Sequence, residues 1–242
     1  MTTQDGSLPS DPGRRRLFQA VGAAGVATAL PLVPVQAAQQ QAAAKQAYIF
    51  FNPAEATFIE SAVARLIPKD ETGPGAIEAG VPNYIDKQLG GAWGAGERLY
   101  RSGPWQQGAA TQGYQLPFTP AEFFRTAIRA INEKHPGFAT LSPQEQDKFI
   151  DALQKGNEDL GGVSSNIFFA SLLEVTIEGF FADPVYGGNR DMTSWKMIGF
   201  PGAYADFYEY VDKHNVAYTA PPTSLAQDAN GRIHVHVKLK RT

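Results

Sequence analysis

The sequence predicts a mainly α-helical protein, an irregular helical single domain with long loops and a short C-terminal strand. Three observations support this prediction. Three helix starts share one capping pattern, a long apolar segment follows them, and clear period-two alternation of apolar residues appears near the C-terminus. With 242 residues, 43% of them hydrophobic, the chain is long enough to bury a sizeable core.

Composition excludes several classes of function. The formal net charge is only -3, so the chain has no electrostatic footprint for nucleic acid, and we expect no such partner. There is no cysteine. This excludes disulfides, cysteine-ligated zinc, iron–sulfur clusters and covalent c-type haem attachment within the chain.

The first 37 residues have the pattern of an export signal. Arg15, Arg16 and Phe18 belong to the order Arg-Arg-Leu-Phe, which resembles the twin-arginine signal, and an uncharged run rich in Ala and Gly follows. Small residues before Ala37 predict cleavage there, with Ala38 as the alternative. Prolines and weak hydrophobicity argue against a membrane span. The polar stretch 38–46 predicts a flexible leader.

Three helices are predicted from one shared design. Each begins with a capping residue, then Pro at the first helical position, then Glu at the third. The cap oxygen can accept an unpaired backbone N–H, and the Glu side chain can reach back to the cap. The pattern predicts helices over 53–67, 120–134 and 143–155, each with an apolar stripe.

Other segments give weaker or different signals. Apolar residues cover most of the circumference of a predicted helix over 165–181, so we expect it to be central and buried. Shorter helices are predicted at 82–89 and 204–214. The stretch 90–115, rich in glycine and aromatic residues, predicts a long ordered loop.

The C-terminus alternates between apolar and basic residues. Ile233, Val235, Val237 and Leu239 alternate with histidines and lysines, which predicts a strand that must pair with another segment or chain. Two of the intervening residues, His234 and His236, would share one strand face; a solvent-facing strand edge is the favoured interpretation, and a metal site is the alternative. We expect a helical domain over 47–219 and an extension over 220–242.

No catalytic, cofactor-binding or metal-binding residues are predicted for this chain. The dinucleotide fingerprint, the phosphate loop and the nucleophile elbow are all absent from the sequence. Glu174 and Glu178 lie one turn apart on the predicted central helix. Paired carboxylates can act in acid–base chemistry, but a structural ion pair with Arg or Lys is the favoured interpretation.

The segment 179–203 combines turn residues with a dense set of aromatics. Asp183-Pro184 predicts a helix end, and Gly187-Gly188 permits a tight turn. Aromatics, Met and Arg are also typical of protein–protein hot spots. The candidate partner-interface residues are Phe180, Phe181, Asp183, Tyr186, Asn189, Arg190, Trp195, Met197 and Phe200.

The segment EGFFADPVYGGNRDMTSWKMIGFPGA, residues 178–203, resembles the signature of a known family. It is similar to the small subunit of membrane-bound gluconate 2-dehydrogenase, also called subunit 3 or the gamma chain. The resemblance extends back over 58–69 and 123–130, and covers about 47–219. The long motif is specific, whereas the helical remainder is not.

The resemblance implies a non-catalytic subunit of a flavin-dependent complex. Its partners would be a large flavoprotein of the glucose-methanol-choline type, carrying FAD, and a multihaem cytochrome c, carrying haem c. The small subunit would use the twin-arginine export machinery. It would support export and stability of the flavoprotein, in the periplasm at the inner membrane. The reaction would be oxidation of D-gluconate to 2-keto-D-gluconate or of a related sugar.

Two other classes of function stay open at this point. The chain could be a standalone periplasmic enzyme that uses Glu174, Glu178, Asp183 and Arg190, or it could be a solute-binding protein. A bound flavin in the purified chain would contradict the subunit interpretation.

Overall fold

The computed structural model describes residues 47–106, 108–109, 115–204, 207–227 and 231. Within these residues the chain forms six α-helices, four short 3-10 helices and no strand, so the predicted mainly helical class is confirmed. The predicted export signal with Arg15, Arg16 and Phe18, the predicted cleavage site at Ala37, the predicted leader and the predicted C-terminal strand all fall outside the described residues. No described helix is long and apolar enough to cross a membrane.

The three predicted capping boxes all form. Helix α2 (Pro53–Leu66), helix α4 (Pro120–Lys134) and helix α5 (Pro143–Lys155) begin after Asn52, Thr119 and Ser142. Each cap side chain accepts the N–H of the Glu at the third helical position, and that Glu accepts the N–H of the cap in return. Local sequence therefore fixes where these helices start.

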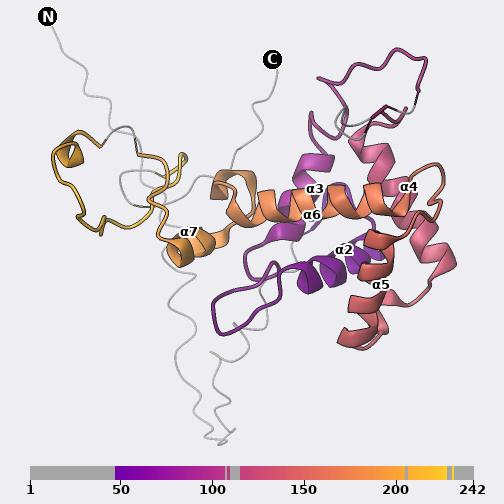
Figure 1. Ribbon diagram of the computed structural model, residues 1–242, viewed down its shortest axis with the longest axis horizontal. Coiled ribbons are helices and arrows are strands. Elements are labelled where there is room, and N and C mark those ends of the chain that lie inside the picture. Colours follow the sequence, from indigo (N-terminus) through magenta and orange to yellow (C-terminus); the bar gives the residue numbers. More distant parts are fainter. Residues whose placement is uncertain (1–46, 107, 110–114, 205–206, 228–230, 232–242) are drawn as a thin grey trace, which may run out of the picture. The chain divides into compact units, whose positions relative to one another are not determined.

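Helix α6 (Ser165–Phe181) is central, as predicted, and contacts α2, α3 (Val81–Leu89), α4, α5 and α7 (Thr193–Ile198) (Figure 1). The buried Phe168 ring lies 5.7–6.2 Å from the rings of Phe58, Phe123 and Phe124. One face of α6 is open, although most of the helix is buried as expected. Ile167 and Ile177 are exposed on its outer face, which no described helix covers.

The segment that leads into α2 is fixed to the helices by two charged side chains. Asp86 on α3 is 1% exposed, and its carboxylate accepts the N–H groups of Ile49, Phe50 and Phe51 at 2.8–2.9 Å. Arg125 on α4 donates to the Phe50 carbonyl and lies over its ring. The chain therefore enters the helical unit at an ordered segment.

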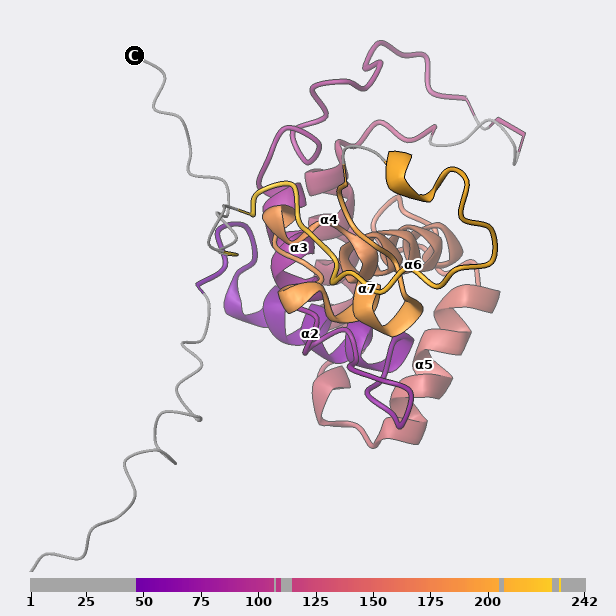
Figure 2. The same ribbon diagram turned by 90° about the vertical axis from the view of Figure 1, so that its left-hand side faces the viewer.

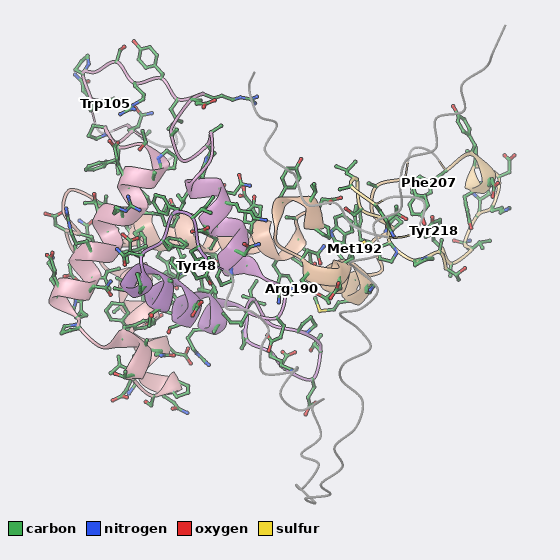
Figure 3. The ribbon with its side chains drawn as sticks, turned by 180° about the vertical axis from the view of Figure 1, so that it is seen from behind. Tyr48, Trp105, Arg190, Met192, Phe207 and Tyr218 are labelled. Atoms are coloured by element: carbon green, nitrogen blue, oxygen red, sulfur yellow. The ribbon has the colours of Figure 1, made fainter. Side chains whose placement is uncertain are left out.

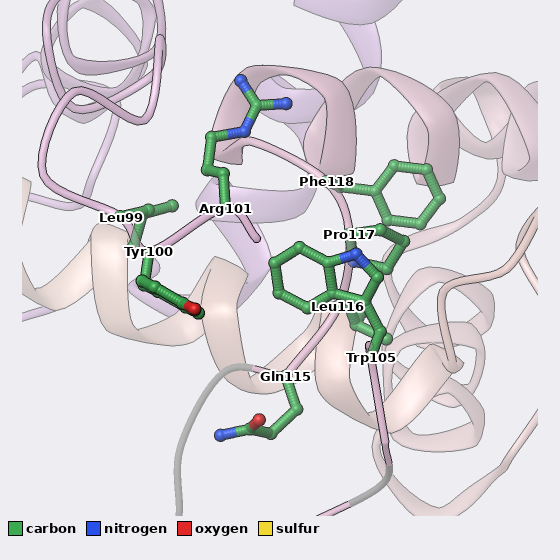
Figure 4. A pocket seen from close by; sticks show the side chains of 8 residues that line it. All are labelled: Leu99, Tyr100, Arg101, Trp105, Gln115, Leu116, Pro117 and Phe118. Carbon is green, nitrogen blue, oxygen red and sulfur yellow. The ribbon is translucent and has the colours of Figure 1, made fainter. Parts of the chain in front are cut away.

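The connection from α3 to α4 is a long loop, as predicted, with the described part held by turns. Trp93 packs edge-on against Phe124, with ring centroids 6.4 Å apart. Further along, Leu99, Tyr100, Trp105 and Phe118 help to line a small pocket (Figure 4). This pocket contains neither a carboxylate nor a histidine among its lining residues.

The predicted helix over 204–214 was wrong. In its described part the only regular structure is a 3-10 turn, Tyr208–Tyr210. The aromatic side chains pack on one another instead of forming one helical stripe: the ring centroids of Phe207 and Tyr218 are 5.6 Å apart (Figure 3), and those of Tyr210 and Tyr218 are 5.2 Å apart. Contacts within the loop override the weak helical periodicity.

Candidate functional site

The loop that follows α6 is held by buried side-chain hydrogen bonds. Asn189 is fully buried; its amide donates to the Ala182 carbonyl at 2.9 Å and accepts the Ser194 N–H at 3.0 Å. The buried Ser194 hydroxyl lies within hydrogen-bond distance of the Phe180 carbonyl and of Asn189. Trp195 donates its indole N–H to the Phe181 carbonyl at 2.8 Å. The start of α7 is thus tied back to the end of α6 (Figure 2).

Two glycines make this return possible. Gly187 has φ +98°, and its carbonyl accepts a hydrogen bond from the Asn83 side chain on α3 at 2.7 Å. Gly188 passes so close to α6 that an added Cβ would lie 2.1 Å from the Gly179 carbonyl oxygen. The Gly-Gly pair therefore serves two different needs, a left-handed turn and a close backbone approach.

Three residues that are not glycine also adopt left-handed backbone conformations in this loop. Asn189, Asp191 and Met192 have φ values of 42°, 56° and 55°. Such conformations cost about 1–3 kcal/mol each and persist only where the surroundings fix them. Sequence reasoning missed this cluster, since Met carries no signal for it and Asn and Asp tolerate this conformation without requiring it.

Asp183 connects the loop to the C-terminal extension. Its carboxylate is 8% exposed and accepts hydrogen bonds from the Ser224 hydroxyl at 2.6 Å and the Leu225 N–H at 2.8 Å. A bridge between Gly202 and Thr223 lies next to this contact. Residues 223–225 are therefore part of the same structural unit as the loop, which the sequence did not indicate.

The nine candidate interface residues fall into two groups. Phe180, Asp183, Asn189 and Trp195 are buried and bond or pack within the chain. The exposed group comprises Phe181, Tyr186, Arg190, Met197 and Phe200. Ile198 is 56% exposed beside Met197 on α7, and it belongs to the same apolar run although it was not among the nine candidates. We call Phe181, Met197, Ile198 and Phe200 the α7 surface.

Arg190 belongs to this loop, and its positive charge has no partner carboxylate among the described residues. Its backbone N–H donates to the Ala79 carbonyl at 2.9 Å, which fixes the Cα position. Its guanidinium runs beside Gly80, where an added Cβ would lie 3.4 Å from Nη2. Figure 3 labels its place in the fold, and no described carboxylate forms an ion pair with it. An exposed, positioned guanidinium of this kind can bind a carboxylate of another molecule.

Glu174 and Glu178 do not form the structural ion pair that was favoured. Within the described chain neither pairs with a basic side chain; instead, the Tyr84 hydroxyl donates to Glu178 at 3.3 Å. Burial, helped by the charge of Glu174, raises the pKa of Glu178. Asp183 accepts hydrogen bonds from Ser224 and Leu225, so its carboxylate has a structural role.

The described residues offer a binding surface more clearly than a reaction centre. No group of three or more metal-ligating side chains occurs among them, and His135 lies at 3.4 Å from Glu158 on the surface. His234 and His236 lie outside the described residues. What this segment does supply is an apolar surface on a fixed backbone, together with the exposed cationic side chains of Arg190 and Lys196.

Comparison with known protein families gives a match, and it covers the helices and the loop after α6. No curated protein and no solved structure matches the sequence. The family model described as gluconate 2-dehydrogenase subunit 3 matches residues 53–202. The match runs from the start of α2 to the bridge residue Gly202, and so contains every helix from α2 to α7 and the whole loop after α6. The chain belongs to the gluconate 2-dehydrogenase subunit 3 family.

Proposed function

We propose that this chain is the non-catalytic small subunit of a periplasmic, membrane-bound dehydrogenase complex of the gluconate 2-dehydrogenase type. It binds a flavoprotein large subunit of the glucose-methanol-choline type and supports its export and stability. The complex oxidises D-gluconate to 2-keto-D-gluconate, or a related sugar. FAD belongs to the flavoprotein, and haem c belongs to a multihaem cytochrome c that anchors the complex to the inner membrane.

The α7 surface is the observation that carries this proposal. Met197, Ile198 and Phe200 are 38%, 56% and 45% exposed, and they follow one another along a short segment. Exposed apolar side chains that follow one another in this way are typical of protein interfaces. The backbone beneath them is fixed by the hydrogen bonds of Asn189, Ser194 and Trp195. A fixed surface loses little conformational entropy on binding, which favours a stable contact.

A charge placed on this surface tests the proposal. We expect Ile198→Asp to abolish co-purification of the flavoprotein, because a carboxylate would be desolvated at the contact. The control is Leu141→Asp, since Leu141 is 40% exposed but lies before α5, outside the α7 surface. Both variants should keep the helix content of the parent, measured by circular dichroism. If Ile198→Asp assembles as Leu141→Asp does, the α7 surface is not the contact.

Arg190 provides the test against the enzyme alternative. An interface Arg contributes about 2 kcal/mol, so Arg190→Ala should raise the dissociation constant of the complex roughly 30-fold. The Michaelis constant of the complex that still forms should change much less. Normal assembly with lost turnover would instead assign Arg190 to catalysis and would contradict the subunit role.

A further inference from the structure

The outer face of α6 carries a shallow groove. Phe169, Leu173 and Ile177 form its apolar floor, and Gln154 of α5 borders it. Ile177 is 46% exposed. These side chains recur at intervals of four residues, so they form one stripe along the helix. The groove is an apolar helix face left open by the described helices.

Two carboxylates give this groove a negative charge. Glu174 and Glu178 line it one turn apart. No lysine or arginine is among its lining residues, and none of the described basic side chains pairs with either carboxylate. A ligand complementary to the groove would therefore present apolar side chains together with cations.

The C-terminal segment of this chain has that chemistry. Residues 232–242, which lie outside the described residues, read RIHVHVKLKRT. Four of these residues are apolar: Ile233, Val235, Val237 and Leu239. Six are Lys, Arg or His: Arg232, His234, His236, Lys238, Lys240 and Arg241. No acidic residue occurs in it. The segment is thus opposite to the groove in charge and alike in hydrophobicity.

The described C-terminal residues anchor the chain near the end of α6, seven residues before this segment begins. Ser224 and Leu225 bond to Asp183, which lies two residues beyond Phe181, the last residue of α6. Eleven extended residues span about 36 Å, whereas the helix from Phe169 to Glu178 is about 14 Å long. The segment is therefore long enough to reach the whole groove.

We propose that residues 232–242 bind intramolecularly in the α6 groove, with their apolar side chains on Phe169, Leu173 and Ile177 and their cations at Glu174 and Glu178. The segment is a built-in occupant that covers the open face of the central helix. Because it is covalently attached, its effective concentration at the groove is high even if each contact is weak. This inference does not depend on the identity of the partner subunits.

The absence of cysteine from the chain makes the test direct. In the purified full-length chain, Ile177→Cys is combined with Val237→Cys, and disulfide formation under mild oxidation is followed on non-reducing gels. The control pair is Glu71→Cys with Val237→Cys, because Glu71 is exposed in the loop between α2 and α3. We expect the first pair to form an intramolecular disulfide roughly tenfold faster than the control pair.

The charges are tested in the same assay. Adding Glu174→Gln and Glu178→Gln, or 0.5 M salt, should slow the 177–237 reaction severalfold, while Glu97→Gln with Glu133→Gln should not. Helix content before oxidation, measured by circular dichroism, identifies any variant that fails to fold. Equal rates for the two cysteine pairs would overturn the proposal. A disulfide-linked dimer through 177 and 237 would overturn it in favour of a second copy as the occupant.

Discussion

The Asp183 carboxylate accepts a hydrogen bond from the Ser224 hydroxyl at 2.6 Å, across 41 residues of sequence. Its second oxygen accepts the Leu225 N–H at 2.8 Å. Asp183 also caps the 3-10 turn Pro184–Tyr186 by accepting the Val185 N–H at 3.0 Å. One buried side chain therefore ends α6, starts the loop after it and holds a segment that lies beyond the family match.

Replacing Asp183 with Ala should destabilise the protein. The change leaves the buried Ser224 hydroxyl and the Leu225 N–H without their acceptor, which we expect to lower the free energy of unfolding by about 2 kcal/mol. Urea denaturation measures this change. Asp212→Ala is the matched control, because Asp212 is exposed and outside this network. Equal stability of the two variants would mean that solvent or another group replaces the carboxylate at no cost.

The glycines of the loop should differ in their tolerance of Ala. Gly199 has φ +70° with no atom within 4 Å of an added Cβ, so Gly199→Ala reports backbone strain alone, about 1 kcal/mol. Gly187→Ala adds a contact at 2.6 Å with the Asn83 side chain, which can move. Gly188→Ala meets the fixed Gly179 carbonyl at 2.1 Å and should cost about 3 kcal/mol.

Thermal denaturation of the three glycine variants gives the order directly. We expect the melting temperature to fall least for Gly199→Ala, more for Gly187→Ala and most for Gly188→Ala. If Gly188→Ala and Gly199→Ala have the same melting temperature, the close approach of Gly188 to α6 does not hold the loop in place.

Local signals in the sequence predicted much of the helical framework. The features that they did not predict depend on tertiary contacts. The caps at Asn52, Thr119 and Ser142 act within four residues, so their helices could be predicted. The left-handed backbone at Asp191 and Met192 follows Asn189, whose N–H bonds to the Gly179 carbonyl of α6, a contact that no local pattern encodes. The link from Asp183 to Ser224 spans 41 residues, and neither residue type indicates the other.

The candidate site shows the same division. Composition indicated an interface in 179–203, but exposure depends on which side of the loop faces α6. Trp195 and Phe200 both looked like surface anchors; the structure buries Trp195 at 6% exposure and leaves Phe200 at 45%. Helical periodicity could not decide between them, because the loop changes direction at Asn189 and again at Gly199.

The capping glutamates should give stability a defined pH dependence. Hydrogen bonds from Thr119 lower the pKa of Glu122, and those from Ser142 lower the pKa of Glu145, below the ordinary value of 4.5. A carboxylate with a lowered folded-state pKa stabilises the fold fully above pH 4.5, and this stabilisation is lost as the pH falls through the folded-state pKa.

Stability measured from pH 7 to pH 3 tests this expectation. Glu122→Gln with Glu145→Gln should be less stable than the parent at pH 7, and the gap should close below pH 4.5. Glu133→Gln is the control, since Glu133 is exposed near the end of α4 and makes no described hydrogen bond. A gap that is constant over the whole range would show that the charge of the glutamates does not contribute.

The last prediction concerns export of the partner. The sequence predicts an export signal at Arg15-Arg16-Leu17-Phe18, and it contains no dinucleotide or phosphate-loop motif. Twin-arginine export carries folded proteins, and a flavoprotein must acquire FAD before it crosses. We therefore expect this chain to carry the flavoprotein across the membrane. Changing Arg15 and Arg16 to Lys keeps the charge but removes the planar guanidinium fork that a receptor would bind.

In the double-Lys strain both chains should remain in the cytoplasm, and dehydrogenase activity should disappear from the membrane fraction. Fractionation with activity staining measures this. The Ile198→Asp variant with an intact signal separates export of this chain from its binding of the flavoprotein. That variant should reach the periplasm alone, because its signal is intact while its contact is lost. An active flavoprotein in the periplasm of the double-Lys strain would mean that it crosses without this chain, and the carrier role would be wrong.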